Sequence, residues 1–400
     1  MAKPASPRGR PRLVLSLGLV LLLSSACSAD QSGRLKVEPS AAVPSTTAND
    51  QRRYVGEFTP VGSMNAARQS PGVVALADGR ILFVGGRDGQ SGGFLASAEI
   101  FDPQTGFFSP TGSTAEPRLA PAAARLTDGR VLVTGGEQAA GQPIASAQLY
   151  DPQTGTFSAT GAMRAARSGA TATLLADGRI LIVGGDPGLS AQPEIYNPRS
   201  GTFASTGPLL EPRFGQTATL LADGRVLIAG GSGRSSTDPL TSAELFDPQT
   251  GLFSATGAML KPRSFYTATR LADGRVLLAG GYLPLNGQAR YYLDAAELFD
   301  PPTGRFSATG SLIIPRDGHR AIRLADGRVL IVGGEISDGT QVTYLPQAEI
   351  YDPQSGNFSL SGTLGAARTE PAVALLADGR VLIAGGRNAQ GYLKSAEIYH

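Results

Sequence analysis

A short apolar run that ends in two glycines returns seven times along the chain. Ile81 to Val84 and Val226 to Ala229 are two of these runs, and each follows the triplet Asp-Gly-Arg. Runs of four residues that are rich in β-branched side chains and bounded by glycines are typical of buried β-strands. The Asp-Gly pair supplies the positive φ angles of a tight hairpin turn. The pattern therefore predicts a hairpin in each copy, with the run as its second strand and a stretch such as Thr171 to Leu175 as its first.

The rest of each copy predicts two more strands. The sequence A-[EQ]-[IL]-[YF] follows a variable segment and predicts a third strand; DPQTG and FSATG usually come next and predict a turn and a fourth strand. The fourth strands carry the phenylalanines at 58, 108, 157, 203, 253, 306 and 358. Successive Asp-Gly-Arg triplets lie 46 to 53 residues apart, a period that is typical of propellers and solenoids.

All variation in length lies in one segment of the repeat. From the second glycine to the Glu or Gln of the third strand the distance ranges from 9 to 16 residues, whereas from that residue to the next Asp-Gly-Arg it is always 29. Loops on a rigid scaffold are where binding residues usually gather, although unselected surface loops also change in length. The segment between the second and third strands is therefore the first place to look for function.

The two ends of the chain predict a closed ring. The last copy ends at His400, directly after its third strand, and lacks a fourth. Phe58 to Gly62 resembles a fourth strand and precedes the first triplet by 20 residues, as Phe108 precedes the second. Closure of this kind leaves only short protected edges, whereas a straight solenoid needs polar capping repeats. We predict an all-β, seven-bladed propeller over residues 57–400, in which an N-terminal strand completes the last blade.

With four apolar residues, two glycines and two spaced aromatic residues in each copy, the chain resembles the kelch-repeat β-propeller family, including the central domain of galactose oxidase. The resemblance covers residues 57–400, but Phe replaces the Trp that many kelch repeats carry in the fourth strand. It implies a kelch-type propeller with four antiparallel strands in each blade. Kelch domains include binding modules and a few enzymes, among them proteins like galactose oxidase and sialic-acid epimerase, so the fold leaves the function open.

Residues 1–26 predict a secretory signal peptide. Four basic residues precede the apolar segment Leu13 to Leu23, which is too short to span a membrane. Cys27, the only cysteine, follows Leu23-Ser24-Ser25-Ala26, which is similar to the lipobox of bacterial lipoproteins. We therefore predict lipid attachment at Cys27 and a location in the cell envelope, at the membrane surface. Cleavage after Ala29 is the alternative, which would release a soluble periplasmic or secreted protein.

Removal of the signal peptide changes the formal net charge from +2 to −2, because all four charges before Cys27 are positive. A chain without a cationic excess is poorly suited to neutralise phosphates, which argues against nucleic acid as a partner. Residues 27–56 are rich in Ser, Ala, Pro and Thr and predict a flexible tether with a reach of about 30 Å. Contact with the membrane is expected through the lipid anchor only.

The fifth and sixth copies carry the strongest candidates for a binding site. Their variable segments are the longest, and strand alternation places these segments on the same face as the links between blades. Tyrosine suits a sugar ring or a protein partner because it combines a flat apolar face with a polar end. The candidates, predicted at the rim of the ring, are Phe265, Tyr266, Tyr282, Arg290, Tyr291, Tyr292, Asp317, His319 and Tyr344. Some of these aromatic residues are equally well explained as anchors for long loops.

These patterns favour a non-catalytic binding module at the bacterial cell envelope, with a protein or glycan as its partner. A carbohydrate-active enzyme similar to sialic-acid epimerase, with Arg316, His319 and Glu370 as conceivable participants, and a structural envelope protein are the alternatives. Arginines in every link and the acids of the third strands recur with the blade, so we predict that they are structural.

We predict neither a metal nor another cofactor. The chain has two histidines, His319 and His400. The copper site that the resemblance to galactose oxidase implies requires two histidines, tyrosines and a tyrosine joined to a cysteine, and Cys27 belongs to the signal region. His319 beside Asp317 is a possible acid–base pair, although a lone histidine at a rim is more often a polar contact.

Overall fold

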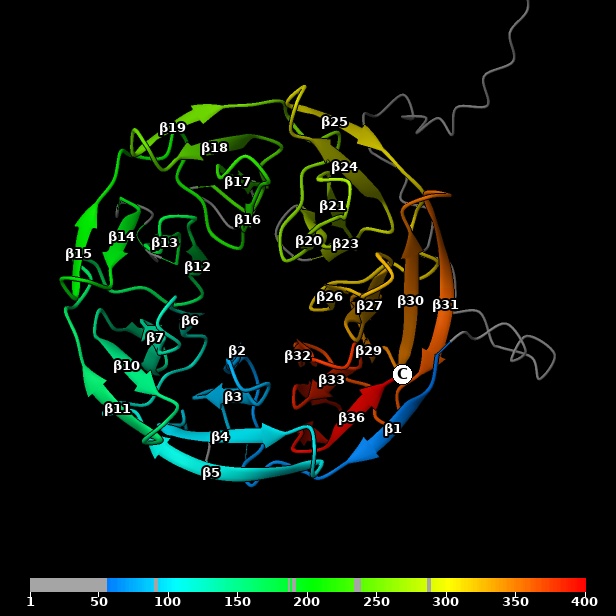
Figure 1. The fold of residues 1–400 in the computed structure, drawn as a ribbon. Helices are drawn as coiled ribbons and strands as arrows, with labels where there is room; N and C mark the ends of the chain where they lie inside the picture. Colours follow the sequence, from blue (N-terminus) through cyan, green and yellow to red (C-terminus); the bar gives the residue numbers. More distant parts are fainter. Residues whose placement is uncertain (1–55, 90–92, 186–187, 189–191, 234–238, 286–288) are drawn as a thin grey trace, which may run out of the picture. The chain divides into compact units, whose positions relative to one another are not determined.

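The computed structural model describes residues 56–400 except 90–92, 186–187, 189–191, 234–238 and 286–288. The predicted signal peptide, Cys27 and all of the predicted tether before Gly56 lie outside these residues. The described chain forms seven antiparallel sheets of four strands, arranged as blades in a ring (Figure 1). This confirms the predicted seven-bladed all-β propeller. In this part of the chain there is no helix with the length and apolar character needed to cross a membrane.

Each blade runs from an inner strand to an outer strand. The inner strands are β2 (Gly72–Ala75), β6 (Ala122–Arg125), β12 (Thr171–Leu174), β16 (Thr217–Leu220), β20 (Thr267–Arg270), β26 (Arg320–Arg323) and β32 (Ala372–Leu375). The second strands are β3 (Ile81–Val84), β7 (Val131–Thr134), β13 (Ile180–Val183), β17 (Val226–Ala229), β21 (Val276–Ala279), β27 (Val329–Val332) and β33 (Val381–Ala384). The third strands are β4 (Ser97–Asp102), β10 (Ala147–Asp151), β14 (Glu194–Asn197), β18 (Ala243–Asp247), β24 (Ala296–Asp300), β30 (Gln347–Asp352) and β36 (Ala396–Tyr399).

The outer strands are β5 (Phe107–Ser113), β11 (Thr156–Ala159), β15 (Thr202–Ser205), β19 (Leu252–Ala255), β25 (Arg305–Ala308), β31 (Asn357–Thr363) and β1 (Phe58–Val61). Four of the variable segments form small hairpins of their own. These pair β8 (Glu137–Ala139) with β9 (Gln142–Pro143), β22 (Tyr282–Leu285) with β23 (Ala289–Tyr292), β28 (Glu335–Ser337) with β29 (Val342–Tyr344), and β34 (Arg387–Asn388) with β35 (Gly391–Tyr392).

The hydrophobic core is divided into layers between neighbouring blades. All four residues of every second strand are buried. In β3, Ile81 and Phe83 pack into the cluster shared with the last blade, whereas Leu82 and Val84 pack into the cluster shared with the second blade. Side chains of a strand alternate between its two faces, and here both faces meet another sheet. This is why the runs are continuously apolar instead of alternating with polar residues.

The ring closes where the two ends of the described chain meet. In Figure 1, β1 (blue) lies beside β36 (red), with Phe58 paired to Tyr399. Their ring centroids are 5.1 Å apart, similar to the 4.8 to 4.9 Å between the aromatic residues of the third and fourth strands in the other blades. The backbone N–H of Gly386 also donates to the carbonyl of Arg68 at 2.8 Å across the seam. The predicted completion of the last blade by an N-terminal strand is confirmed.

We expect Phe58→Ala to lower the free energy of unfolding by about 2 kcal/mol, because it removes a half-buried aromatic contact with Tyr399 at the seam. Denaturant unfolding of the full chain measures this loss. Phe157→Ala, which removes the equivalent contact with Tyr150 inside a continuous blade, is the matched control. A seam variant as stable as the wild type would contradict the structural role of β1.

The links between blades are held by buried arginines. These are Arg68, Arg118, Arg167, Arg213, Arg263, Arg316 and Arg368, each at most 1% exposed. Each donates from Nη1 to the carbonyl of the first glycine of its own double glycine at 2.7 to 3.1 Å. Six of them also pair with the third-strand glutamate at 2.6 to 3.3 Å. The predicted structural role of these repeated charges is confirmed.

The double glycine is needed for the contact between blades. Gly86 donates to the carbonyl of Arg118 in the next blade at 2.8 Å. A Cβ on Gly85, whose φ is 68°, would lie 2.2 Å from the same carbonyl oxygen. Only glycine tolerates both the positive φ and this close approach. The arginine, the glutamate and the two glycines therefore fix the geometry of each link, on which the variable residues are mounted.

Candidate functional site

The links and the variable segments meet on one face of the ring, and the backbone pairs two variable positions in most blades. The residue after the buried arginine forms an antiparallel bridge with the residue after the double glycine. The pairs of this kind are Gln69–Arg87, Leu119–Glu137, Phe214–Ser232, Ser264–Tyr282, Asp317–Glu335 and Thr369–Arg387. Their chemistry differs from blade to blade while their geometry is constant. The sixth blade is the one in which two carboxyl groups are placed opposite each other.

Asp317 and Glu335 are both buried, at 4% and 7% exposed. Their backbones exchange two hydrogen bonds, from Asp317 N to Glu335 O at 3.2 Å and from Glu335 N to Asp317 O at 2.9 Å. Residues directly opposite in this arrangement have their side chains on the same side of the sheet, at short range. Like charges so placed destabilise each other, so this pair is not explained by the stability of the fold.

An arginine from each neighbouring blade reaches this carboxyl pair. Arg290 of the fifth blade lies on β23 and places Nη1 3.3 Å from Asp317 Oδ2. Arg387 of the seventh blade starts β34 and places Nη2 3.3 Å from Glu335 Oε2. The side chains of these arginines are 50% and 38% exposed, so they cover the buried acids while facing solvent. The sixth blade thus offers two shielded acids beneath two accessible cations.

The pKa values of both acids are raised. Burial is the main reason that the pKa of Asp317 is raised to about 7. The negative charge of Glu335 also raises this pKa, and its effect is larger than the opposing effect of Arg290. Burial likewise raises the pKa of Glu335, against the opposing effect of Arg387. A carboxyl group with a pKa near neutrality exchanges its proton at physiological pH, which is a property of catalytic acids and bases.

Glu370 and Phe265 occupy strained positions on the same rim. The second residue after each buried arginine has a positive φ, and this residue is glycine in three of the seven blades. Phe265 and Glu370 hold it with φ values of 55° and 50°. Glu370 Oε2 accepts hydrogen bonds from Gln69 Nε2 at 2.6 Å and from Ser70 Oγ at 2.9 Å. Large side chains in this conformation are uncommon and gather at functional sites.

The aromatic candidates surround the carboxyl pair. The ring of Phe265, 45% exposed, stacks on that of Tyr282 with centroids 5.7 Å apart. The guanidinium carbon of Arg290 lies 4.5 Å from the centroid of the Tyr282 ring. Tyr291 is 42% exposed on the same hairpin. Burial raises the pKa of Tyr292 to about 12. Tyr344 accepts a hydrogen bond from Arg387 Nη1 at 3.4 Å, so the hairpins and both arginines form one continuous patch.

The prediction that Tyr266 and His319 lie exposed at the rim is wrong, because these side chains are only 6% and 1% exposed. The Tyr266 hydroxyl donates to the carbonyl of Ala229 in the preceding blade at 2.7 Å, and His319 Nε2 lies 3.0 Å from Thr267 Oγ1. Burial lowers the pKa of His319 to about 3, so the ring is neutral. Gln216, at the same position of the fourth blade, bonds to Val183 O at 3.0 Å in the same way. These side chains fill the space between blades, which removes them from the accessible surface.

Glu335 and Arg387 are site residues that the sequence analysis missed. Both follow a double glycine directly and were counted as the start of a variable segment. The signal was present in the alignment of the copies, since this position pairs across the link with the residue after the buried arginine. Comparing, copy by copy, the residue after the buried arginine with the residue after the double glycine would have identified the acidic pair.

The raised pKa of Asp317 predicts a pH-dependent stability. An aspartate in an unfolded chain has a pKa of about 3.9, so between about pH 4 and pH 7 the folded protein keeps a proton that the unfolded chain has released. Stability therefore falls as the pH rises through this window. We expect Asp317→Asn to raise the free energy of unfolding by about 1 to 4 kcal/mol at pH 8, and to give no gain at pH 3.5.

Urea unfolding at both pH values measures this difference. Asp338→Asn is the control on the same face, because a hydrogen bond from Thr340 lowers the pKa of the exposed Asp338 to about 2, and its replacement should change stability in the opposite direction. A gain for Asp317→Asn that is equal at pH 8 and pH 3.5 would contradict a buried acid that titrates near neutrality.

Among solved structures, the chain is similar to a fungal alcohol oxidase of the AA5 family in complex with copper. The TM-score is 0.70 at 18% sequence identity, and the similarity covers 86% of this chain and 76% of that chain. No family model matches the chain, and no curated protein matches its sequence. The comparison supports the predicted resemblance to kelch-type proteins at the level of the propeller fold.

The prediction of a non-catalytic binding module is contradicted by this comparison, because the similar structure is that of an enzyme. At 18% identity the similarity shows the fold alone, so the reaction of that oxidase does not carry over to this chain. The physical reason for the wrong prediction is that it rested on exposed tyrosines and overlooked the buried carboxyl pair.

The residues that the structure describes do not fit a copper centre. Within the described ranges, three or more His, Cys, Asp or Glu side chains are nowhere grouped so that they could hold a metal ion. His319 is enclosed between blades. His400 directly follows β36, and its Nε2 lies 2.7 Å from Thr59 Oγ1 of β1. The charged groups that the structure brings together at this site are its carboxyl groups and arginines.

Proposed function

We propose that this chain is an acid–base enzyme that acts on a carbohydrate, with Asp317 and Glu335 as its catalytic carboxyl groups. The observation that carries the proposal is the buried pair itself, in which Asp317 has a pKa of about 7 and both acids lie beneath accessible arginines. Buried like charges cost stability, and such a cost is typical of functional sites. We also propose that the repeats are of the kelch type.

The two acids are suited to different roles. With a pKa of about 7, Asp317 can carry a proton at neutral pH, so it is the candidate to donate a proton to the substrate. Glu335 is held by the guanidinium of Arg387, which favours its ionised form and suits it to accept a proton. Environments that separate two carboxyl groups in this way assign the acid and the base of a reaction.

The surroundings favour a sugar that carries a carboxylate. Arg290 covers Asp317 and is itself half exposed, so a carboxylate that binds Arg290 would draw it away and uncover the acid. The rings of Phe265 and Tyr291 offer flat apolar faces beside polar groups, as sugar rings require. Binding of the substrate carboxylate and exposure of Asp317 are then coupled through Arg290.

The test is conversion of a panel of neutral and uronic-acid-containing oligosaccharides by the full chain in D₂O, followed by NMR and mass spectrometry. We expect cleavage or deuterium exchange of at least one acidic sugar, and loss of that conversion in Asp317→Asn and in Glu335→Gln. Asp338→Asn, which changes an exposed acid in the turn of the hairpin that Glu335 begins, should retain it. The proposal fails if the wild type converts none of the panel, or if the two variants convert it at the wild-type rate.

We further propose that the protein is exported and held at the membrane surface of the cell envelope by a lipid on Cys27. The support is the sequence of residues 1–27, which combines basic residues, an apolar segment and a lipobox-like cysteine. An exported location would place the site where carbohydrates of the envelope occur. Radiolabelled palmitate incorporation that is lost in Cys27→Ser tests this.

A further inference from the structure

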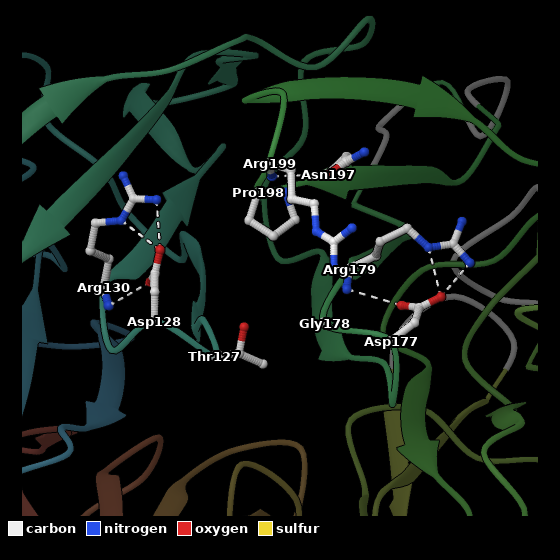
Figure 2. A pocket seen from close by; sticks show the side chains of 9 residues that line it. All are labelled: Thr127, Asp128, Arg130, Asp177, Gly178, Arg179, Asn197, Pro198 and Arg199. Atoms are coloured by element: carbon white, nitrogen blue, oxygen red, sulfur yellow. Dashed lines mark hydrogen bonds and ion pairs between the residues drawn. The ribbon is translucent and has the colours of Figure 1, made fainter.

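A second feature lies on the opposite face of the ring, at the junction of the second and third blades. The Asp-Gly-Arg turns of two neighbouring blades and the turn after the third strand enclose a hollow of about 610 Å³ there (Figure 2). Equivalent hollows, lined by the same repeat positions, lie at the junctions of the fourth and fifth blades and of the fifth and sixth blades. The repeat thus supplies internal controls for what is special about the first one.

Three departures from the repeat converge in this hollow. Thr127 stands where the other six copies have alanine before Asp-Gly-Arg, Asn197 stands where the other complete turns have aspartate, and Arg199 stands where they have glutamine or proline. Thr127 approaches the next blade, since a Cβ on Gly178 would lie 3.5 Å from its hydroxyl oxygen. Together the changes remove a carboxylate, add a guanidinium and add a hydroxyl donor.

Of the two further arginines that line the hollow, Arg130 is the one whose donors remain available to a ligand. Arg130 and Arg179 each bind the aspartate of their own turn, through distances of 2.7 Å from Arg130 Nη2 to Asp128 Oδ2 and 2.6 Å from Arg179 Nη2 to Asp177 Oδ2. Arg130 Nη1 has no hydrogen-bond partner among the described residues, whereas Arg179 Nη2 also donates to the carbonyl of Pro248 in the fourth blade at 2.8 Å and so faces the next junction. Arg199 is exposed, and its guanidinium makes no ion pair or hydrogen bond within the described part of the chain. Figure 2 shows Arg199 between Arg130 on one side and Arg179 on the other.

We infer that this hollow binds a tetrahedral oxyanion, a phosphate or sulfate group, between Arg130 and Arg199, with the hydroxyl of Thr127 as a further donor. Replacement of Asp by Asn and of Gln by Arg raises the local formal charge by two relative to the consensus turn. Guanidinium groups and a hydroxyl are the donors that such anions prefer. The same hollow at the other two junctions keeps Asp300 or Asp352 and has no arginine at the position of Arg199, so it should attract the anion less strongly.

The experiment is calorimetric titration of the full chain with inorganic phosphate, inorganic sulfate and glucose 6-phosphate at low salt. The test variant Asn197→Asp/Arg199→Gln gives the turn the sequence DPQSG, which the chain already uses at Asp352 to Gly356, so its fold is expected to be kept. We expect binding of one anion per chain and at least tenfold weaker affinity in this variant. Comparable affinity for inorganic phosphate and glucose 6-phosphate would identify a site for the free ion, whereas tighter binding of the ester would identify a site for a phosphorylated sugar.

A transfer of the site provides the matched control. Ala272→Thr/Asp352→Asn/Gln354→Arg places the three departures in the equivalent hollow of the fifth and sixth blades, and should raise the stoichiometry from one anion to two. The inference is overturned if the wild type binds none of the three probes, or if Asn197→Asp/Arg199→Gln leaves their affinity unchanged. It is independent of the carboxyl site, because the two lie on opposite faces.

Discussion

Replacing Asp317 with asparagine is expected to lower kcat by about 10²- to 10⁴-fold on an acidic sugar that the wild-type chain converts. Asparagine has the shape of aspartate but carries no exchangeable acidic proton, so the change removes proton donation and keeps the hydrogen bonds of the backbone pair. Because the same change is expected to stabilise the fold at neutral pH, a loss of activity cannot be attributed to unfolding. Activity and stability therefore move in opposite directions, which a merely structural residue would not produce.

The pH dependence gives this prediction a second readout. If Asp317 is the proton donor, kcat/KM of the wild type falls as the pH rises through about 7, because the acid loses its proton. Arg290 lowers the pKa of Asp317, so Arg290→Met should move that fall to higher pH. A profile that rises through pH 7 instead would assign Asp317 as the base, and a profile unchanged by Arg290→Met would separate it from the reaction.

Much of the fold was predictable because each of its features is encoded within a single copy of the repeat. The continuous apolar run predicts a strand buried on both sides, and the Asp-Gly-Arg turn predicts the hairpin that precedes it. Closure of the ring was predictable because Phe58 keeps its spacing of 20 residues to the first triplet, although its partner Tyr399 is 341 positions away. The regular spacing of the repeat predicted this long-range strand pairing, whereas the amino-acid composition alone would not have done so.

The site was only partly predictable because it depends on contacts between copies. Arg290 and Asp317 were identified from the longest variable segments, and the structure brings them together. Tyr266 and His319 were placed at the rim because their residue types suit ligands, but their position in the link points toward the preceding blade. The sequence of a single copy does not predict whether a side chain of the link points to the solvent at the rim or toward the preceding blade. Glu335 was missed for the same reason, since its importance comes from the residue across the bridge.

Stability of the scaffold depends on the buried pair that recurs in the links, and the sixth blade gives the sharpest test of it. Arg316 and Glu349 are both 0% exposed, and their charged atoms are 2.7 Å apart. Glu349 also accepts hydrogen bonds from the backbone N–H groups of Ile313 and Ile314, at 2.8 and 3.1 Å. The carboxylate of Glu349 therefore neutralises Arg316 and also accepts hydrogen bonds from two backbone N–H groups that precede this arginine in the link.

We expect Glu349→Gln to lower the free energy of unfolding by about 3 to 5 kcal/mol, because it leaves the guanidinium of Arg316 buried without a counter-charge. Burial already lowers the pKa of Arg316, which reports the cost of holding its charge there. Denaturant unfolding of the full chain measures the loss. An effect below about 1 kcal/mol would show that the pair is not required, as is typical of exposed ion pairs.

The second blade contains the natural control for this prediction. Gln148 occupies the position of the glutamate there, and Arg118 is met instead by Glu116 at 3.5 Å, a side chain that is 39% exposed. Gln148→Glu should be neutral or slightly stabilising, since it supplies a second carboxylate to Arg118. Glu116→Gln should then destabilise the wild type but hardly affect the Gln148→Glu background, and this non-additivity identifies neutralisation of the buried arginine as the common requirement of all the links. Equal effects of Glu116→Gln in the two backgrounds would refute that requirement.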